Sequence, residues 1–364
     1  MLNEIKAILR NFPGLTGREI AKKIKKDKKD VNSYLSKNND GLYKDDWKWY
    51  LKASETIEWN IECQSWLTCE KFEESYLNIG DLLGSAEPNV VISFPEDFKV
   101  LLIAGARIIS LSNQLNHAGK QVTLNFKKCT HAIGYLNRLG CFDHIHKNIE
   151  VLPKRPKSSK AKQYKGNSKN IVEIGDIDLN AFNEDLPKEL TAAFTHQVGD
   201  DYYMAAFTVF SELIGNVEEH SETPIPGFAA LQLYSGKQKH IQTVISDHGR
   251  GLSNTLKANL SVHYPKLAST LNLDDIESDV SLIKKALTDG KLSRFGHNSD
   301  DKARGLGLKR SQDYALKYNA EITIRQESFL VKLIFSKGEL VKSSCKKNLG
   351  IIAGTHICFD FILE

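Results

Sequence analysis

Three polar residues, spaced four apart, run along one apolar segment of the chain. Glu212, Asn216 and His220 lie within FTVFSELIGNVEEHS, residues 207–221. The apolar residues of this segment recur at spacings of three and four, which predicts a helix with one buried face. Positions four apart lie in one row along a helix, so the polar row borders that face. Buried carboxylate and carboxamide groups are costly unless something binds them, and a nucleotide with its metal ion is one such ligand.

A second segment offers a carboxylate between a strand and a glycine-rich turn. VISDHGRGL, residues 244–252, predicts a strand that ends at Asp247, followed by Gly249 and Gly251. An ionised carboxylate only accepts hydrogen bonds, so Asp247 suits the exocyclic amine of adenine and would repel the carbonyl of guanine. The two glycines lack Cβ atoms, which lets the backbone turn sharply beside a ligand.

Two further segments follow toward the C-terminus. ARGLGL, residues 303–308, is a glycine-rich turn before a predicted helix, and backbone N–H groups at such a helix N-terminus bind phosphate. It is not a P-loop, because the Gly-Lys-Ser/Thr ending is absent. AGTHICFDF, residues 353–361, predicts a terminal strand that contains Thr355. The residues of the turn that we expect to hold the nucleotide are Gly305, Leu306, Gly307 and Leu308.

In this order, the four segments resemble the GHKL ATP-binding fold that gyrase B, MutL, sensor histidine kinases and anti-sigma kinases share. The resemblance implies an α/β sandwich over residues 171–364, with a mixed sheet and helices on one face. It implies ATP and Mg²⁺ as ligands, with Asn216 holding the metal. Glu212 matches the residue that positions or deprotonates the attacking water, His220 matches a phosphate-proximal position, and Thr355 matches the partner of Asp247.

A long segment separates the second and third motifs. Residues 253–302 lie between them, and long insertions within a domain are usually functional lids. We therefore expect this segment to fold over the nucleotide, with Arg294 as a phosphate-sensing residue.

Residues 1–52 predict a winged helix-turn-helix: three short helices followed by a strand–turn–strand. The second helix opens with Thr16 and Glu19, which have the spacing of a capping box. The third helix carries a run of lysines, and its position is the one that such domains present to a nucleic acid.

The runs LTGREIAKKI, KKDVNSYL and WKWYL resemble the Z-alpha type of winged helix. The resemblance implies that Lys28, Asn32 and Trp49 contact a nucleic-acid backbone, and Lys29 adds a further charge for ordinary phosphate binding. The tyrosine of that family falls at Ser36 here, so recognition of left-handed duplexes is not supported. A winged helix that binds a partner protein is the alternative interpretation.

Three segments join these two ends. Residues 53–87 are predicted to be a helical connector. Residues 88–150 predict strands and helices in an order that resembles STAS-like domains, although no phosphoacceptor hydroxyl stands between the first strand and the long helix. Residues 151–170 hold seven basic residues and no acidic one, which predicts a basic linker. Residues 1–50 are also basic, with twelve Lys or Arg against seven Asp or Glu, so a polyanionic partner is expected in these regions.

Composition narrows the classes of function. The six cysteines are scattered without a Cys-x-x-Cys pair, which indicates reduced thiols rather than a zinc site or a disulfide framework. No apolar run approaches the ~18 residues of a membrane span, and the start lacks the features of a signal peptide. We therefore expect a cytoplasmic protein without a membrane partner.

The expected function is an ATP-dependent switch of the GHKL type, with slow Mg²⁺-dependent hydrolysis and binding of a nucleic acid or partner protein through residues 1–52. One alternative is an anti-sigma-like serine/threonine kinase that acts in trans, since such kinases also carry a glutamate at the position of Glu212. A non-enzymatic, nucleotide-dependent binding module is the other alternative. The resemblance also allows a homodimer.

Overall fold

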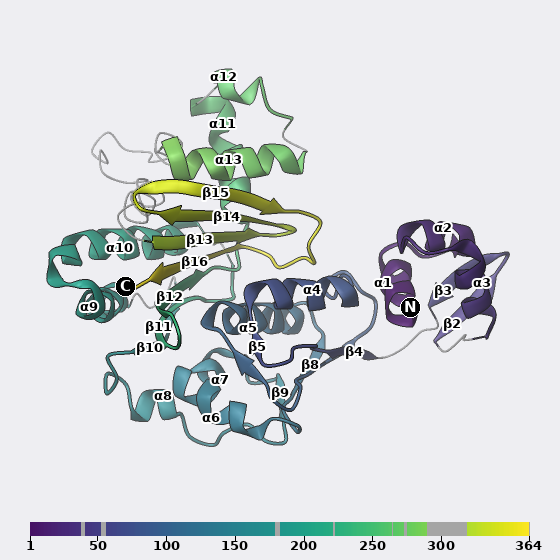
Figure 1. The fold of residues 1–364 in the computed structure, drawn as a ribbon, viewed down its shortest axis with the longest axis horizontal. Coiled ribbons are helices and arrows are strands. Elements are labelled where there is room, and N and C mark those ends of the chain that lie inside the picture. Colours follow the sequence, from purple (N-terminus) through teal and green to yellow (C-terminus); the bar gives the residue numbers. More distant parts are fainter. Residues whose placement is uncertain are drawn as a thin grey trace. The chain divides into compact units, whose positions relative to one another are not determined.

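The computed structural model describes residues 1–37, 41–51, 56–178, 183–220, 223–263, 265–272, 275–289 and 319–363 (Figure 1). These residues form helices and several sheets, so the predicted mixed α/β class is confirmed at that level. The chain divides into two compact units. The first comprises Met1–Val100, Ser112–Ile133 and His146–Arg155, and the second comprises Leu101–Leu111, Gly134–Ile145 and Pro156–Glu364.

Within the first unit, residues 1–51 contain three helices and a three-stranded antiparallel sheet. The helices are α1 (Leu2–Asn11), α2 (Gly17–Lys23) and α3 (Lys28–Lys37), and the strands are β1 (Leu15–Thr16), β2 (Leu42–Asp45) and β3 (Lys48–Leu51), in the order β1-β3-β2. The predicted helices and hairpin are therefore present. Their shared core consists of Ile5, Leu9, Ile20, Ala21, Val31, Leu35 and Leu42.

The predicted capping box at the start of α2 is confirmed. The Thr16 hydroxyl accepts from the Glu19 N–H at 3.4 Å, and the Glu19 carboxylate accepts from the Thr16 N–H at 2.8 Å. At the start of α3, the Asp27 carboxylate accepts from the Lys29 N–H at 2.7 Å. These bonds satisfy backbone donors that have no partner inside the helix, and they fix where each helix begins.

A four-stranded parallel sheet forms the rest of the first unit. Its strands are β4 (Thr56–Asn60), β6 (Asn89–Ser93), β8 (Gln121–Asn125) and β9 (Glu150–Leu152), in that spatial order, and a short parallel pair joins β5 (Trp66–Leu67) to β7 (Lys99–Val100). The helices along this part of the chain are α4 (Cys69–Ile79), α5 (Leu102–His117), α6 (Thr130–Leu139) and α7 (Cys141–His144). The boundary between the two units passes through α5 and α6, so the compact units do not follow the predicted domain limits.

Two predictions for the joining segments are wrong. Residues 53–87 are not simply a helical connector, because β4 lies at the edge of the parallel sheet and alternates buried and exposed side chains. Trp59 is 1% exposed there and donates from Nε1 to the Ser75 hydroxyl at 2.9 Å. Residues 151–170 are not a free linker, since they include part of β9 and the short helix α8 (Lys160–Gln163), whose Ala161 is buried.

The second unit is built on a seven-stranded sheet. Its spatial order is β10-β11-β12-β16-β13-β14-β15, and every described pair is antiparallel (Figure 1). The strands are β10 (Ile171–Ile177), β11 (Gly227–Ser235), β12 (Lys239–Ser246), β13 (Asn319–Gln326), β14 (Phe329–Ser336), β15 (Glu339–Lys346) and β16 (Thr355–Ile362). The expectation of a mixed sheet is therefore wrong. Short turns join β11 to β12, β13 to β14 and β14 to β15 as antiparallel hairpins.

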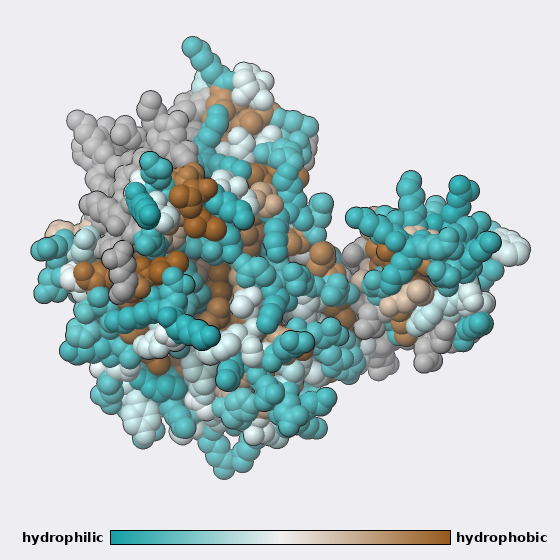
Figure 2. Space-filling view, viewed as in Figure 1, coloured by the Kyte–Doolittle hydropathy of each residue, from teal (hydrophilic) through white to brown (hydrophobic). Residues whose placement is uncertain are grey.

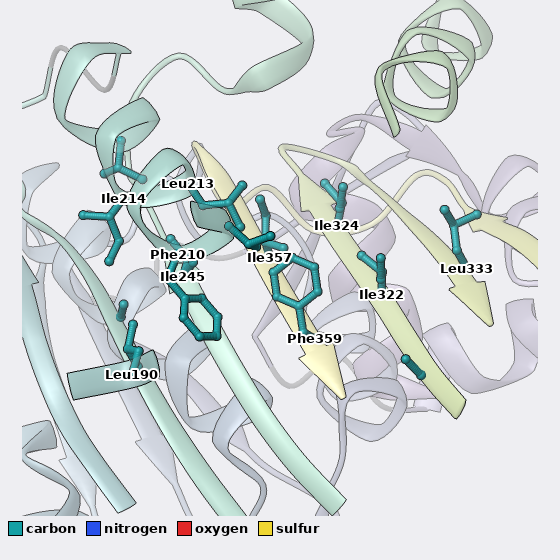
Figure 3. Close-up of a cluster of buried hydrophobic side chains, with 14 of the residues drawn as sticks. Leu190, Phe210, Leu213, Ile214, Ile245, Ile322, Ile324, Leu333, Ile357 and Phe359 are labelled. Carbon is teal, nitrogen blue, oxygen red and sulfur yellow. The ribbon is translucent and has the colours of Figure 1, made fainter. Parts of the chain in front are cut away.

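Helices cover one face of this sheet and share its main core. They are α9 (Leu186–Val198), α10 (Tyr203–His220), which a short 3-10 turn (Asp200–Tyr202) precedes, α11 (Leu252–His263), α12 (Pro265–Ala268) and α13 (Ile276–Asp289). In Figure 3 the side chains of Phe210 and Leu213 point from α10 toward the sheet, where Phe359 of β16 is also buried. The alternating inward residues of the strands complete the core, as expected for a sheet that is covered by helices.

The opposite face of the sheet is also covered within this unit. The Leu102 N–H donates to the Tyr234 hydroxyl at 2.7 Å, and the Tyr135 hydroxyl donates to the Gln232 side chain at 2.6 Å. Residues of α5 and α6 therefore lie against this face. The described helices within residues 171–364 cover one face of the sheet, as expected, and the second face is covered by helices that precede this range. Among the described residues, no helix has the length and apolarity that crossing a bilayer requires.

Candidate functional site

Asp247 directly follows β12, and its carboxylate is held by two backbone donors. Oδ1 accepts from the Gly249 N–H at 2.8 Å, and Oδ2 accepts from the Thr355 N–H at 3.0 Å. The side chain is 8% exposed. The Thr355 side chain also hydrogen-bonds to this carboxylate. A carboxylate has about four lone-pair positions, so one acceptor position remains for a further donor. The turn after β12 and the start of β16 therefore fix the orientation of this group. Its place at the end of a strand is the one predicted from the sequence.

Burial raises the pKa of the Asp247 carboxyl above its ordinary value, because the charged form loses water. The hydrogen bonds from Gly249 and Thr355 favour the charged form and partly offset that shift. A donor from a bound ligand would stabilise the carboxylate in the same way. The arrangement is consequently suited to a ligand that brings an N–H group and no acceptor to this position.

Thr355 connects the first residues of β16 to the turn that follows β12. Its hydroxyl accepts from the Leu252 N–H at 2.9 Å, at the start of α11. The Asp247 N–H in turn donates to the Thr355 carbonyl at 2.9 Å. Asp247, Thr355 and the first turn of α11 are therefore one hydrogen-bonded cluster, which agrees with the predicted pairing of Asp247 with Thr355.

Two glycines let these segments approach each other. Gly251 has φ +78°, and a Cβ there would lie 2.9 Å from Oε1 of Gln326. Gly354 has φ +91°, and a Cβ there would lie 2.2 Å from the Asp247 carbonyl oxygen. The sequence predicts Gly251 as a turn glycine, whereas the need for Gly354 comes from a contact between distant segments. Gly249 contributes the N–H that binds Asp247, and its φ is not positive.

The predicted polar row lies on α10, next to the end of β12. Glu212 and Asn216 are half-buried, and one carboxylate oxygen of Glu212 is shielded from solvent. His220 is the last residue of α10, and its side chain lies outside what the structure describes. A Cβ on Gly227 would lie 2.6 Å from Cγ1 of Val217 and 2.8 Å from the Ser246 carbonyl oxygen. The turn of α10 that carries Asn216 therefore packs where β11 begins and β12 ends, one residue before Asp247.

The remaining predicted nucleotide contacts fall outside the described residues. These are Gly305, Leu306, Gly307, Leu308 and the proposed phosphate sensor Arg294. Most of the expected lid is described, and its described part packs into the core of the unit. Leu256 and Leu260 of α11 and Ile283 of α13 are buried in the main core, so residues 252–263 and 276–289 are structural elements of the unit.

Sequence reasoning missed two buried groups beside Asp247. His248 is 5% exposed, its Nδ1 lies 3.0 Å from the Pro226 carbonyl oxygen, and burial lowers its pKa to about 4. Gln326 is fully buried and accepts at Oε1 from the Ser253 N–H at 3.2 Å. A histidine after the aspartate and a glutamine at a strand end have no distinctive sequence pattern, so only the tertiary fold brings them to this cluster.

Metal binding in this region would depend on few protein ligands. Across the part of the chain that the structure describes, no three His, Cys, Asp or Glu side chains are placed to hold a metal ion together. Mg²⁺ keeps several waters and usually takes one or two protein oxygens plus substrate phosphates. A single carboxamide oxygen from Asn216, supplemented by phosphate and water, therefore fits this ion. Mg²⁺ does not require a site that is made of protein ligands alone.

The predicted nucleic-acid contacts of residues 1–52 occupy different environments. Lys28 and Lys29 are exposed on α3 and form no ion pair with the described residues. Asn32 is also exposed, but its Oδ1 lies against the backbone of Gly17. Trp49 is half-buried against the core of this module. Figure 2 shows mostly hydrophilic side chains on the visible face of these residues.

Comparison of the chain with protein-family models, with curated proteins and with solved structures gave no match.

Proposed function

We propose that the second unit binds Mg·ATP, and that the chain is a nucleotide-dependent regulatory protein of the GHKL type. The observation that carries this proposal is the fixed carboxylate of Asp247, which keeps one acceptor position after its bonds to the Gly249 N–H, the Thr355 N–H and the Thr355 side chain. An amine donor such as the exocyclic group of adenine satisfies it. A purine with a carbonyl at that position would place an acceptor against an acceptor.

The row on α10 supplies the second half of the proposal. Asn216 would hold Mg²⁺ through its side-chain oxygen, and Glu212 would orient the water that attacks the terminal phosphate. The packing of Val217 against Gly227 and Ser246 supports this role, since it brings the same helical turn to the strand end that carries Asp247. Bound Mg²⁺ would neutralise charge on the phosphates, and the half-buried position of Glu212 limits its exposure to bulk water.

Hydrolysis and coupling belong to the same proposal. We expect slow release of phosphate rather than transfer to a protein, with residues 1–52 binding a nucleic acid through the exposed lysines of α3. A helix that begins with two exposed lysines offers a phosphate-binding surface whose affinity depends on salt. The nucleotide would then act as the signal and residues 1–52 as the part that responds.

Binding of labelled ATP, measured by equilibrium dialysis of the full chain with Mg²⁺, tests the site. Asp247→Asn should lower retention of ATP at least about tenfold, because the amide replaces the charged acceptor. Asp360→Asn is the matched control, because Asp360 lies on the same strand pair, opposite Gln242, away from the end of β12 that carries Asp247. Equal retention by the wild type and Asp247→Asn would refute the proposed site.

The fate of the terminal phosphate tests the reaction. With γ-labelled ATP and Mg²⁺, we expect free phosphate from the wild type and none from Glu212→Ala, which should still bind the nucleotide. Label that stays on a protein would instead favour the kinase, and binding without any turnover would favour a non-enzymatic module.

A further inference from the structure

The turn between β2 and β3 holds a tryptophan in a backbone conformation that bulky residues seldom adopt. Asp45 pairs with Lys48, so the loop consists of Asp46 and Trp47 alone. Their φ angles are 41° and 66°. A two-residue turn with two positive φ values strongly favours Asn or Asp followed by Gly, because glycine has no Cβ to clash. A tryptophan in the second position is a genuine outlier.

Folding gains little from this ring in return. Trp47 is 75% exposed, whereas Trp49, two residues further along, packs against the core. The indole of Trp47 therefore leaves most of its apolar surface in water, and the unfavourable backbone conformation is not offset by burial. An outlier of this kind points to a role in binding rather than in folding.

The surroundings of Trp47 indicate the chemistry of its ligand. Lys44 Nζ lies 4.2 Å from the centre of the indole, a cation–π contact on one face of the ring. On the same hairpin, Tyr43 stacks on Tyr50 with 5.2 Å between ring centres, and Tyr43 is 45% exposed. Two lysines and two aspartates at the tip cancel in charge, so the tip itself is a poor phosphate site. What remains is an exposed aromatic face on a module that is basic overall.

We infer that Trp47 stacks on an unpaired nucleobase, while exposed lysines of α3 contact the phosphates of the same nucleic acid. Every base has a flat π-face, and aromatic side chains bind it without sequence preference. Lys44 would polarise the indole from the other face. The inference rests on the proposed nucleic-acid role of residues 1–52, and it specifies a ligand with single-stranded or flipped bases rather than a closed duplex.

Anisotropy titrations of the full chain with three labelled probes test this inference. The probes are a single strand of about 12 nucleotides, the same strand with every base removed, and the blunt duplex of that sequence. Trp47→Ala should lower affinity for the base-bearing single strand about 10- to 100-fold. Affinity for the abasic strand, which keeps the phosphates, should stay within about twofold of wild type, since no base is lost.

Two further variants separate stacking from folding and from exposure alone. Trp47→Gly should lose the same affinity while its unfolding temperature equals or exceeds that of the wild type, because glycine tolerates positive φ. Trp66→Ala is the matched control, since Trp66 is 40% exposed with Lys99 5.9 Å from its ring centre. It should bind all three probes like the wild type.

Three results would overturn the inference. These are unchanged affinity of Trp47→Ala for the single strand, an equal loss on the abasic strand, and failure of the wild-type chain to bind any probe. Lys28→Glu combined with Lys29→Glu separates a failure of base stacking from a failure of the proposed phosphate binding by residues 1–52. If that pair weakens binding to all probes while Trp47→Ala does not, phosphate binding by residues 1–52 stands and base stacking fails.

Discussion

Gly354 is the residue where the candidate site tolerates the least change. A Cβ there would lie 2.2 Å from the Asp247 carbonyl oxygen and 2.8 Å from the His248 Cα, both of them backbone atoms. The backbone also has φ +91°, a conformation that glycine adopts without strain. The site therefore depends on a glycine at this position, because the missing side chain lets β16 approach the end of β12.

We predict that Gly354→Ala lowers the free energy of unfolding by about 3 kcal/mol or more, since positive φ and overpacking act together. Gly119→Ala is the matched control, because Gly119 has φ +84° but a Cβ there would meet no atom within 4 Å. It should lose only about 1 kcal/mol. Urea unfolding of both variants measures the difference, and equal losses would show that the close approach contributes nothing.

His248 makes stability depend on pH. Burial lowers its pKa to about 4, so the folded protein resists a proton that the unfolded chain accepts near pH 6.5. Between these values the unfolded state binds more protons, and stability falls as pH falls. His356, whose pKa burial and neighbouring cationic groups hold well below its usual value, acts in the same direction. Asp247 has the opposite effect. Its pKa is raised in the folded protein above the ordinary value of 3.8, so stability falls as pH rises above that value.

The free energy of unfolding of the wild type should fall as pH falls from 6.5 to 4. We predict that this fall is about 3 kcal/mol smaller in His248→Asn. Asparagine can still donate to the Pro226 carbonyl but does not titrate in this range. Chemical unfolding at a series of pH values yields the two curves. Their difference isolates His248 together with its electrostatic effect on His356, because Asp247 is common to both proteins. Parallel curves would contradict the assigned role of His248.

At the scale of elements, an ion pair joins α6 to β10. Arg138 donates to the Glu173 carboxylate and, at 3.2 Å, to the Tyr164 carbonyl. Glu173 is 7% exposed, so the carboxylate is largely removed from water. An exposed pair contributes little, but removing one partner of a buried pair leaves an uncompensated charge.

We predict that Arg138→Met lowers the free energy of unfolding by about 3 kcal/mol, and that adding Glu173→Leu restores much of it. Lys188→Met is the control, because its pair with Asp185 at 3.2 Å is exposed and should be worth under about 1 kcal/mol. Denaturant melts of the wild type and these three variants form the comparison. If the double variant is less stable than Arg138→Met alone, the loss of stability comes from breaking the ion pair rather than from the uncompensated charge of Glu173.

Local patterns were sufficient to predict part of this fold. The capping box at Thr16 and Glu19, the helix through Glu212 and Asn216, and the strand that ends at Asp247 depend on residues close in sequence. The strand β4 was missed because five residues carry a weak period and its partner β6 lies across an intervening helix. The antiparallel order of the large sheet and the covering of its second face depend on contacts between distant segments, which a single sequence does not reveal.

The candidate site divides in the same way. Asp247, Gly251 and Thr355 were predicted and lie together, whereas His248 and Gln326 were not. Trp49 was chosen for the wing by resemblance, but the structure exposes Trp47 at the tip instead. In both places the missing information is which side chain the fold leaves accessible, and this follows from packing rather than from residue type.

For the whole molecule, the second unit is proposed to sense the nucleotide and residues 1–52 to bind a nucleic acid. The two activities depend on residues far apart in sequence, so each can be removed without the other. Asp247→Asn should leave the binding of single-stranded probes intact in the absence of ATP, and Trp47→Ala should leave nucleotide binding intact. Any dependence of one activity on the other ligand would then measure the coupling between them.

Discrimination between two purines tests the central claim most directly. Inosine triphosphate carries a carbonyl where ATP carries the exocyclic amine, and it is otherwise closely similar. Calorimetric titration with Mg²⁺ should give an affinity for ATP at least about tenfold higher than for inosine triphosphate, the scale of one charge-assisted hydrogen bond. Asp247→Asn, which can donate as well as accept, should narrow or reverse that preference. Equal binding of both nucleotides by the wild type, or binding of neither, would contradict the account.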